Sequence, residues 1–414
     1  MYLTDEEKRM LDGEYGQGTR KAMELQVRQG EFYDADRMVR LSMAYVVAGP
    51  DPDHQLSKYL SELAADGARF RCPTLVPPPD RDNDSMQWGF EDYRRLGGIV
   101  TFGGGFGHAR NPMWYPLFGQ NIMADGTAVT SFFNGVVGAR ANNMDPIGQH
   151  SAAIIGRAPR YGYLTPEGRL GKVLVEVDPK AKPTTDTDWS VLGYYVGLQL
   201  GRHWWDVPVF TGIEPVDLTT DDLVFFCTSL PAYGAVNHFL IVGVSPEART
   251  VQEAFGGQQP KETIVYGPSE RQQVYERFSS HSSHPDMVAI GGFGVETSMP
   301  ALYRVAAALE GKKVQPGFPT FVLMNPVVRA AADVAGLTEI IEAAGVRTSL
   351  DDWGREVGFP HFNPVTDARR AGIRVAVFNN AKSCHYLGQQ EMELALRDTD
   401  ACLRIALTGT IDVD

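Results

Sequence analysis

The chain has 414 residues, of which 43% are apolar and 21% are charged, so it is long enough for two or three folded domains and is not disordered. Its formal net charge of -13 excludes a broad nucleic-acid surface, which would need clustered lysine and arginine. No run of 18 apolar residues occurs and the first residues are acidic, so we expect a cytoplasmic protein with no membrane partner.

The N-terminal part of the chain predicts helices and one strand. Thr4 and Glu7 have the spacing of a capping box, which predicts a helix that ends near Gly13. Prolines after Cys72 predict a loop, because proline interrupts both helices and central strands. Apolar spacing predicts three more elements: a helix over 18–29, a buried strand over 43–48 and a helix over 56–64.

Residues 97–168 are rich in glycine, and we expect them to be irregular and to carry a site. Aromatic residues within them argue against a flexible linker. The stretch Phe102-Gly-Gly-Gly-Phe-Gly is followed by two prolines instead of a helix, which excludes a dinucleotide-binding fingerprint.

From residue 172 onward, predicted strands and helices alternate. The strands are expected over 172–177, 239–244, 287–290, 320–324 and 373–378. The helices are expected over 189–200, 219–230, 268–278, 298–310, 326–335 and 337–344, with a last helix that ends at 407. Such alternation predicts an α/β fold with several parallel or mixed sheets and flanking helices. We expect an N-terminal and central α/β region with glycine-rich site loops over 1–285, and a C-terminal α/β domain over 286–414.

Isolated cations in loops are the strongest candidate ligand-binding residues. Arg140, Arg157 and Lys382 lie in glycine- or asparagine-rich loops, where a guanidinium or ammonium group could hold a carboxylate or phosphate. The alternative for each is an internal salt bridge. Four cysteines are scattered along the chain and predict buried thiols instead of disulfides.

Several segments, taken together, resemble the aconitase X family from the first residue to the C-terminus. They are Met1-Tyr-Leu-Thr-Asp-Glu-Glu, Val136-Val-Gly-Ala-Arg-Ala-Asn, Ala152-Ala-Ile-Ile-Gly-Arg-Ala-Pro-Arg, Leu192-Gly-Tyr-Tyr-Val-Gly and Asn380-Ala-Lys-Ser-Cys-His-Tyr. The resemblance covers the large subunit of that family. It implies an aconitase-like multi-domain architecture, a dehydratase, lyase or isomerase acting on a small carboxylate or hydroxy acid, and a small swivel-domain subunit as a possible partner.

The resemblance also implies an iron–sulfur cluster held by three cysteines, and the chain departs from the family at all three positions. The corresponding stretches here are Thr101-Phe-Gly-Gly-Gly, Gly291-Gly-Phe-Gly and Asp351-Asp-Trp-Gly. We therefore expect no cofactor and assign no metal ligand; the alternative is a single divalent or ferric ion at new ligands. The turn that begins at Gly291 precedes a predicted helix, whose N–H groups could bind an anionic substrate. The alternative is loop drift after loss of activity.

Candidate site residues follow from the loops that match the family's site. The candidate acid–base residues are Asp125, His108, His150, Lys382 and His385. The candidate substrate-binding residues are Arg140, Arg157, Asn142, Gly292, Gly294, Ser298 and Asn380. Each acid–base candidate could instead be structural. The expected function is an aconitase X-like enzyme without an iron–sulfur cluster. The alternatives are a hydro-lyase with a single metal ion and a non-catalytic ligand-binding subunit.

Overall fold

The computed structural model describes residues 1–46, 54–76, 90–101, 115–124, 126–201, 203, 205–234, 236–292, 295, 297–349, 367–389 and 391–411. The chain forms two compact units. The first consists of Met1–Leu174, Trp205–Val209 and Asn237–Glu262, and the second of Val175–Trp204, Phe210–Val236 and Thr263–Asp414. The expected boundary after residue 285 lies inside the second unit and remains a prediction.

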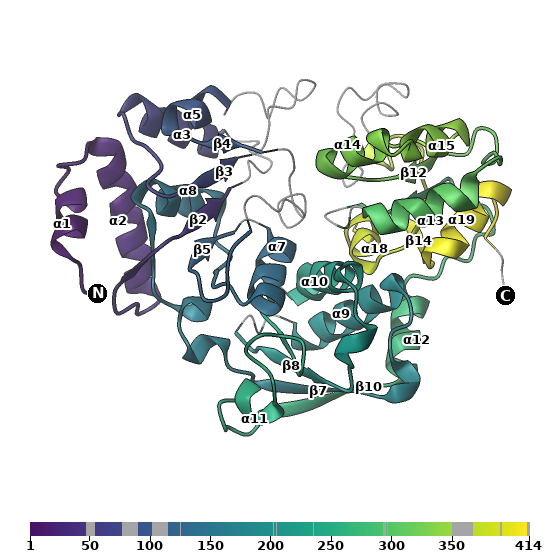
Figure 1. Ribbon diagram of the computed structural model, residues 1–414, viewed down its shortest axis with the longest axis horizontal. Coiled ribbons are helices and arrows are strands. Elements are labelled where there is room, and N and C mark those ends of the chain that lie inside the picture. Colours follow the sequence, from purple (N-terminus) through teal and green to yellow (C-terminus); the bar gives the residue numbers. More distant parts are fainter. Residues whose placement is uncertain are drawn as a thin grey trace. The chain divides into compact units, whose positions relative to one another are not determined.

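The first unit is built on a parallel sheet with the strand order β4-β3-β2-β5. Its strands are β2 (Met43–Tyr45), β3 (Thr74–Val76), β4 (Ile99–Val100) and β5 (Ile122–Met123). The loop predicted after Cys72 is wrong over β3, because Pro73 precedes this strand without interrupting it. Further elements of this unit, most of them labelled in Figure 1, are α1 (Asp5–Leu11), α2 (Gln17–Phe32), β1 (Met38–Arg40), α3 (Gln55–Ala65), α5 (Phe90–Leu96), α7 (Thr127–Phe132), the π-helix η2 (Phe133–Val137), α8 (Pro146–Ile155), β6 (Arg157–Pro159) and α11 (Val251–Ala254).

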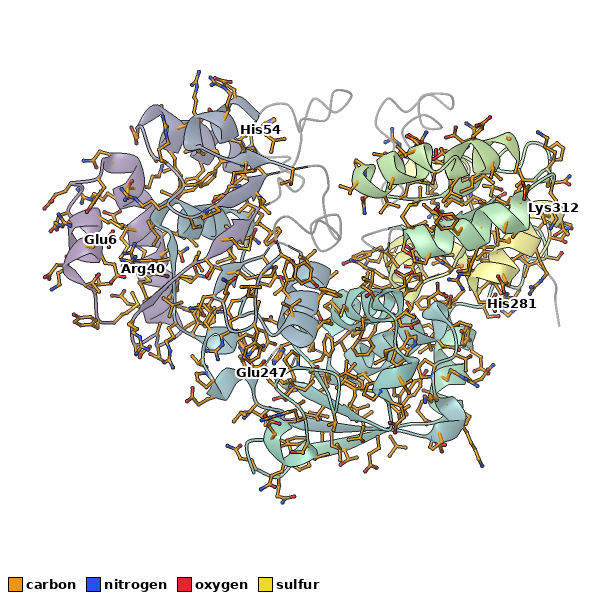
Figure 2. The ribbon with its side chains drawn as sticks, viewed as in Figure 1. Glu6, Arg40, His54, Glu247, His281 and Lys312 are labelled. Atoms are coloured by element: carbon orange, nitrogen blue, oxygen red, sulfur yellow. The ribbon has the colours of Figure 1, made fainter. Side chains whose placement is uncertain are left out.

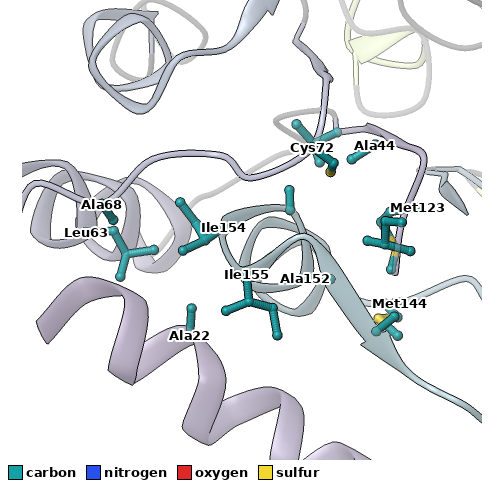
Figure 3. Close-up of a cluster of buried hydrophobic side chains, with 14 of the residues drawn as sticks. Ala22, Ala44, Leu63, Ala68, Cys72, Met123, Met144, Ala152, Ile154 and Ile155 are labelled. Carbon is teal, nitrogen blue, oxygen red and sulfur yellow. The ribbon is translucent and has the colours of Figure 1, made fainter. Parts of the chain in front are cut away.

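Helix α8 lies at the centre of the first unit's core. Every residue from Gly148 to Ile155 is buried. Ile154 and Ile155 pack among side chains that include Ala22 of α2 and Leu63 of α3 (Figure 3). The irregular structure expected over 97–168 is therefore wrong here. A helix that is buried all round lacks the one-sided apolar pattern from which a helix is recognised.

Another four-stranded sheet has the strand order β10-β7-β8-β9. Its strands are β7 (Val173–Val177), β8 (Pro208–Thr211), β9 (Leu240–Ile241) and β10 (Glu262–Tyr266). In the second unit, α9 (Asp186–Leu200) packs against α10 (Thr220–Gly234) at very short range. A Cβ added to Gly197 would lie 2.1 Å from the Leu230 carbonyl oxygen, so glycine is what allows this approach.

The second unit contains a fully parallel sheet with the order β12-β11-β13-β14. Its strands are β11 (Met287–Ile290), β12 (Thr320–Val322), β13 (Val375–Phe378) and β14 (Glu393–Leu396). The helices are α12 (Pro268–Arg277), α13 (Met299–Leu309), α14 (Pro326–Val334), α15 (Leu337–Ala343), α18 (Ala381–Gly388) and α19 (Thr399–Thr408). Side chains of α13, α15 and α19 form a core with the sheet. The predicted fold class is confirmed, but β14 interrupts what was expected to be one helix.

No helix in the described ranges is both long and apolar enough to cross a membrane. The expected cytoplasmic location remains a prediction.

Candidate functional site

The carboxyl edge of the second unit's parallel sheet gathers the beginnings of four helices. Helices α13, α14, α18 and α19 each follow a strand of this sheet, and a polar side chain caps each one. The caps are Ser298, Asn325, Asn380 and Asp398. Because helix N-termini carry partial positive charge, and because ligands of parallel sheets bind at this edge, it is the first place to look for an anion site.

The turn at Gly291 is fastened to the start of α18. The side-chain oxygen of Asn379 accepts a hydrogen bond from the Gly291 N–H at 2.9 Å. Asn380 donates to the Gly291 carbonyl at 3.2 Å and accepts from the Ser383 N–H at 2.8 Å. Asn380 was predicted to bind substrate, but its described bonds shape the turn and cap the helix.

Ser383 is buried against this turn with an unused hydroxyl. Its Oγ makes no hydrogen bond within the described part of the chain, and the residue is fully buried. A Cβ added to Gly292 would lie 3.3 Å from this Oγ, so the glycine leaves the space open. The Nδ2 group of buried Asn325, at the start of α14, also lacks a partner among the described residues. Buried polar groups without partners cost about 1–3 kcal/mol each, so each calls for an explanation, and a ligand that completes the bonding is one.

Two predicted acid–base residues lie on α18, three positions apart. Lys382 is buried, with its Nζ 5.8 Å from the ring centre of Tyr386. His385 is half-buried, and its Nδ1 lies 3.0 Å from the hydroxyl of Tyr194. Burial, together with the nearby Arg277 charge, lowers the pKa of His385. The structure therefore places both residues on one helix next to Ser383.

His150 lies in the first unit and has the contacts of a structural residue. Its Nδ1 is 2.6 Å from the Pro146 carbonyl oxygen, and its Nε2 is 2.9 Å from the Tyr93 hydroxyl. Complete burial lowers its pKa to about 4. Both ring nitrogens are thus occupied by the protein at neutral pH. His108, Asp125 and Gly294 lie outside the described residues, and their predicted roles stay predictions.

Arg157 is held by carboxylates of α1, which is the salt-bridge alternative that the sequence left open. Its Nε lies 3.0 Å from Glu7, and its Nη2 lies 2.5 Å from Glu6. Glu6 also pairs with Arg40 at 3.3 Å, and Figure 2 marks both residues. The guanidinium of Arg157 thus fastens α1 to β6.

Two other predicted substrate-binding residues also make internal bonds. Asn142 donates to the Tyr161 carbonyl and accepts from the Tyr163 N–H, each at 2.9 Å, and so holds the turn between them. Ser298 caps α13 through the Ala301 N–H and bonds to Asp221 of α10. These contacts do not test substrate binding, but they account for both side chains.

Arg140 differs from Arg157 because no partner in the described ranges engages its side chain. It follows the π-helix η2, and its backbone bridges to Asn121 at the start of β5. Its Nε is buried and makes no hydrogen bond to a described residue. A guanidinium group without partners among the described residues can bind a carboxylate or phosphate.

A cavity of about 770 Å³ in the second unit is lined mainly by residues at the beginnings of helices. Thr185 and Asp398 cap α9 and α19, and Asp186 occupies the first turn of α9. Burial, opposed by Arg304, raises the pKa of Asp186 to about 6, and the neighbouring carboxylate of Asp222 adds to the rise. The acidic lining is explained by helix N-termini, which favour carboxylates.

The described residues do not fit a three-thiolate iron–sulfur cluster. All four cysteines are buried; burial raises the pKa of Cys72 to about 11 and also raises those of Cys384 and Cys402. Gly292, at the turn where the family resemblance implies a cysteine, has a φ of +112°, which an L-residue adopts only with strain. No three His, Cys, Asp or Glu side chains in the described ranges are grouped to hold a metal ion.

Comparisons with known proteins agree on one family. The sequence profile of the aconitase X first domain matches residues 1–95, and that of the aconitase X second domain matches residues 171–276. The phosphomevalonate dehydratase large subunit of Thermococcus kodakarensis is 34% identical over 83% of this chain and 86% of its own length. The cis-3-hydroxy-L-proline dehydratase of Pseudomonas aeruginosa is 26% identical over 97% of this chain and 69% of its own length.

A solved structure agrees with these matches. The crystal structure of Thermococcus kodakaraensis aconitase X in its holo-form has a TM-score of 0.81 and 30% identity to this chain. The similarity covers 98% of this chain and 100% of the solved one. The family predicted from the sequence motifs is confirmed: the chain belongs to the aconitase X family.

Proposed function

We propose that this chain is the catalytic large subunit of a dehydratase that removes water from a small hydroxy acid. The phosphomevalonate and hydroxyproline relatives are both named as dehydratases. The phosphomevalonate relatives are also named as large subunits. A small subunit is therefore the expected partner. The candidate substrates are phosphorylated acids, as in the names of the phosphomevalonate relatives, and unphosphorylated acids, as in those of the hydroxyproline relatives. Arg140 suits either kind of acid.

We propose that the substrate acid binds at the beginning of α18. The observation that supports this site is the Ser383 hydroxyl, which has no hydrogen-bond partner among the described residues. Ser383 would donate to a substrate oxygen, while the helix N-terminus and the Lys382 charge would stabilise the carboxylate. The Gly291 turn would let the substrate approach closely, since Gly292 presents no side chain to Ser383.

We further propose that the chain works without an iron–sulfur cluster. A cluster would supply a Lewis acid to the departing hydroxyl, so in its absence a protein group must protonate or stabilise that hydroxyl. Lys382 and His385 are the titratable candidates on the same helix. A hydro-lyase with one metal ion and a non-catalytic binding subunit are the competing functions.

Metal analysis of the purified large subunit, together with its small subunit, separates these proposals. We expect less than stoichiometric iron and acid-labile sulfide in a complex that still dehydrates a hydroxy acid from a panel of phosphorylated and unphosphorylated acids. One equivalent of a metal needed for activity would support the single-metal alternative. Absence of turnover with every acid would support the binding subunit.

The site itself is tested by Ser383→Ala and Ser298→Ala. Removing the unpartnered Ser383 hydroxyl should leave the free energy of unfolding unchanged or raise it by up to about 1 kcal/mol, because a buried unsatisfied group is lost. Dehydratase kcat/KM should nevertheless fall at least about tenfold, equivalent to one lost hydrogen bond.

Ser298→Ala is the matched control at the same sheet edge. It should lose about 1 kcal/mol of stability through loss of the α13 cap. Lys312 is on the surface (Figure 2), so Lys312→Ala should change neither the free energy of unfolding nor kcat/KM. Full activity of Ser383→Ala would contradict the proposed acid-binding site.

A further inference from the structure

The hydroxyl of Tyr194 lies against one ring nitrogen of His385. Tyr194 belongs to α9 and is fully buried, and His385 is half-buried on α18. Their Oη and Nδ1 atoms are 3.0 Å apart. A tyrosine hydroxyl can donate or accept, so the direction of this bond depends on whether the hydroxyl hydrogen has another acceptor.

No other described residue hydrogen-bonds to the Tyr194 hydroxyl. If the His385 ring carried its proton on Nδ1, the buried hydroxyl hydrogen would have no acceptor, which is unfavourable. The hydroxyl therefore donates to His385, whose Nδ1 is the acceptor. His385 is thereby held with its proton on Nε2.

The surroundings of His385 disfavour a second proton on its ring. Tyrosine rings from α9, α10 and α18 surround the imidazole: the ring centres of Tyr194, Tyr233 and Tyr386 lie 5.6, 5.7 and 5.6 Å from its own. The charged group that acts on it is the Arg277 guanidinium of α12. No ion pair joins His385 to a carboxylate in the described part of the chain. The neutral ring is therefore the stable form, consistent with its lowered pKa.

The free nitrogen distinguishes His385 from His150. Both nitrogens of His150 are engaged by the protein. His385 makes one such bond, through Nδ1, and its Nε2 has no hydrogen bond to a described residue. Its Nε2–H can therefore bond to a ligand oxygen.

We propose that Tyr194 is a positioning residue that fixes His385 as the Nε2–H tautomer, so that His385 acts in the reaction as a neutral hydrogen-bond donor. This inference rests on the proposed dehydratase. A neutral imidazole does not give up its remaining proton, since an imidazolate would result, so His385 stabilises negative charge on a substrate oxygen. Transfer of a proton to the departing hydroxyl then falls to another group, for which Lys382 is the neighbouring candidate. This assignment replaces the expected acid–base role of His385.

The test is ¹⁵N NMR of the complex with labelled histidine, with His385 assigned through His385→Gln. The parent should show an unprotonated Nδ1 and a protonated Nε2 near neutral pH. Tyr194→Phe should raise the population of the Nδ1–H form several-fold. Tyr233→Phe is the matched control, because its ring contacts His385 without such a hydroxyl bond, and it should leave the tautomer unchanged.

Kinetics provide the second measurement. Tyr194→Phe should lower kcat by about tenfold with little change in KM, as expected for a lost transition-state contact. A protonated Nδ1 in the parent, or equal effects of the two phenylalanine variants on the tautomer, would overturn the inference. The NMR result needs no substrate. An inactive complex with the expected tautomer would therefore count against the dehydratase alone.

Discussion

Gly292 holds a backbone that disfavours the residue an iron–sulfur ligand would require. Its φ is +112°, and an added Cβ would meet Leu323 and Ser383 at 3.3 Å. The glycine motif could be recognised in the sequence, because three glycines between a strand and a helix indicate a close approach. Neither its φ nor the unused hydroxyl of Ser383 could be predicted, since both depend on how the turn packs against α18.

Restoring a thiol at this turn should therefore cost stability. Gly292→Cys is expected to lower the free energy of unfolding by about 1–2 kcal/mol, because an L-residue is strained at this φ and its Cβ is crowded. Gly311→Cys is the control for left-handed backbone alone, since nothing lies within 4 Å of a Cβ at that position. Urea unfolding gives both values. If Gly292→Cys were as stable as the parent and bound iron, the backbone at this glycine would not disfavour an iron ligand.

The elements were predictable where their pattern was periodic. The helix from 299 to 309, the strand from 287 to 290 and the capping box of α1 agree with expectation to within a residue. Strand β14 was missed because Glu393-Leu-Ala-Leu consists of good helix formers, and its state is set by pairing with β13. Arg157 was assigned to substrate because a cation in a loop looks the same whether its partner is a ligand or a distant carboxylate.

Helix α1 depends on that arginine. It has only seven residues, and its buried Glu7 pairs with Arg157, whose side chain is 8% exposed. Arg157→Ala should lower the free energy of unfolding by about 3 kcal/mol, because it leaves a buried carboxylate without its partner.

The dehydratase KM of folded Arg157→Ala should stay unchanged if the arginine is structural. Arg37→Ala, which removes an exposed ion pair, should cost less than about 1 kcal/mol. Chemical denaturation and steady-state kinetics on the same preparations decide between the roles. A large rise in KM with unchanged stability would return Arg157 to the substrate site.

Across the whole molecule, the two units differ in how their buried titratable groups respond to acid. In the first unit, burial lowers the pKa of His150 from 6.5 to about 4, and burial also lowers that of His238. In the second unit, the pKa of the half-buried His385 is also lowered. The pKa of Asp186 is instead raised, to about 6. This contrast could not be predicted from the sequence, because both pKa shifts depend mainly on how deeply the fold buries each side chain.

The first unit should therefore lose more stability between pH 6.5 and 4. In that window the unfolded chain binds a proton at His150 and the folded chain does not, so stability falls as the pH falls, by up to about 3 kcal/mol from this residue. Asp186 binds its proton more readily when folded, so acid stabilises the second unit and partly offsets the loss from His385. Hydrogen exchange, corrected for the intrinsic rate, should show protection of α8 falling more steeply than that of β11 and β13. His150→Gln should flatten the fall in α8; an equal fall in both units of the parent would mean that these buried groups do not control the acid response.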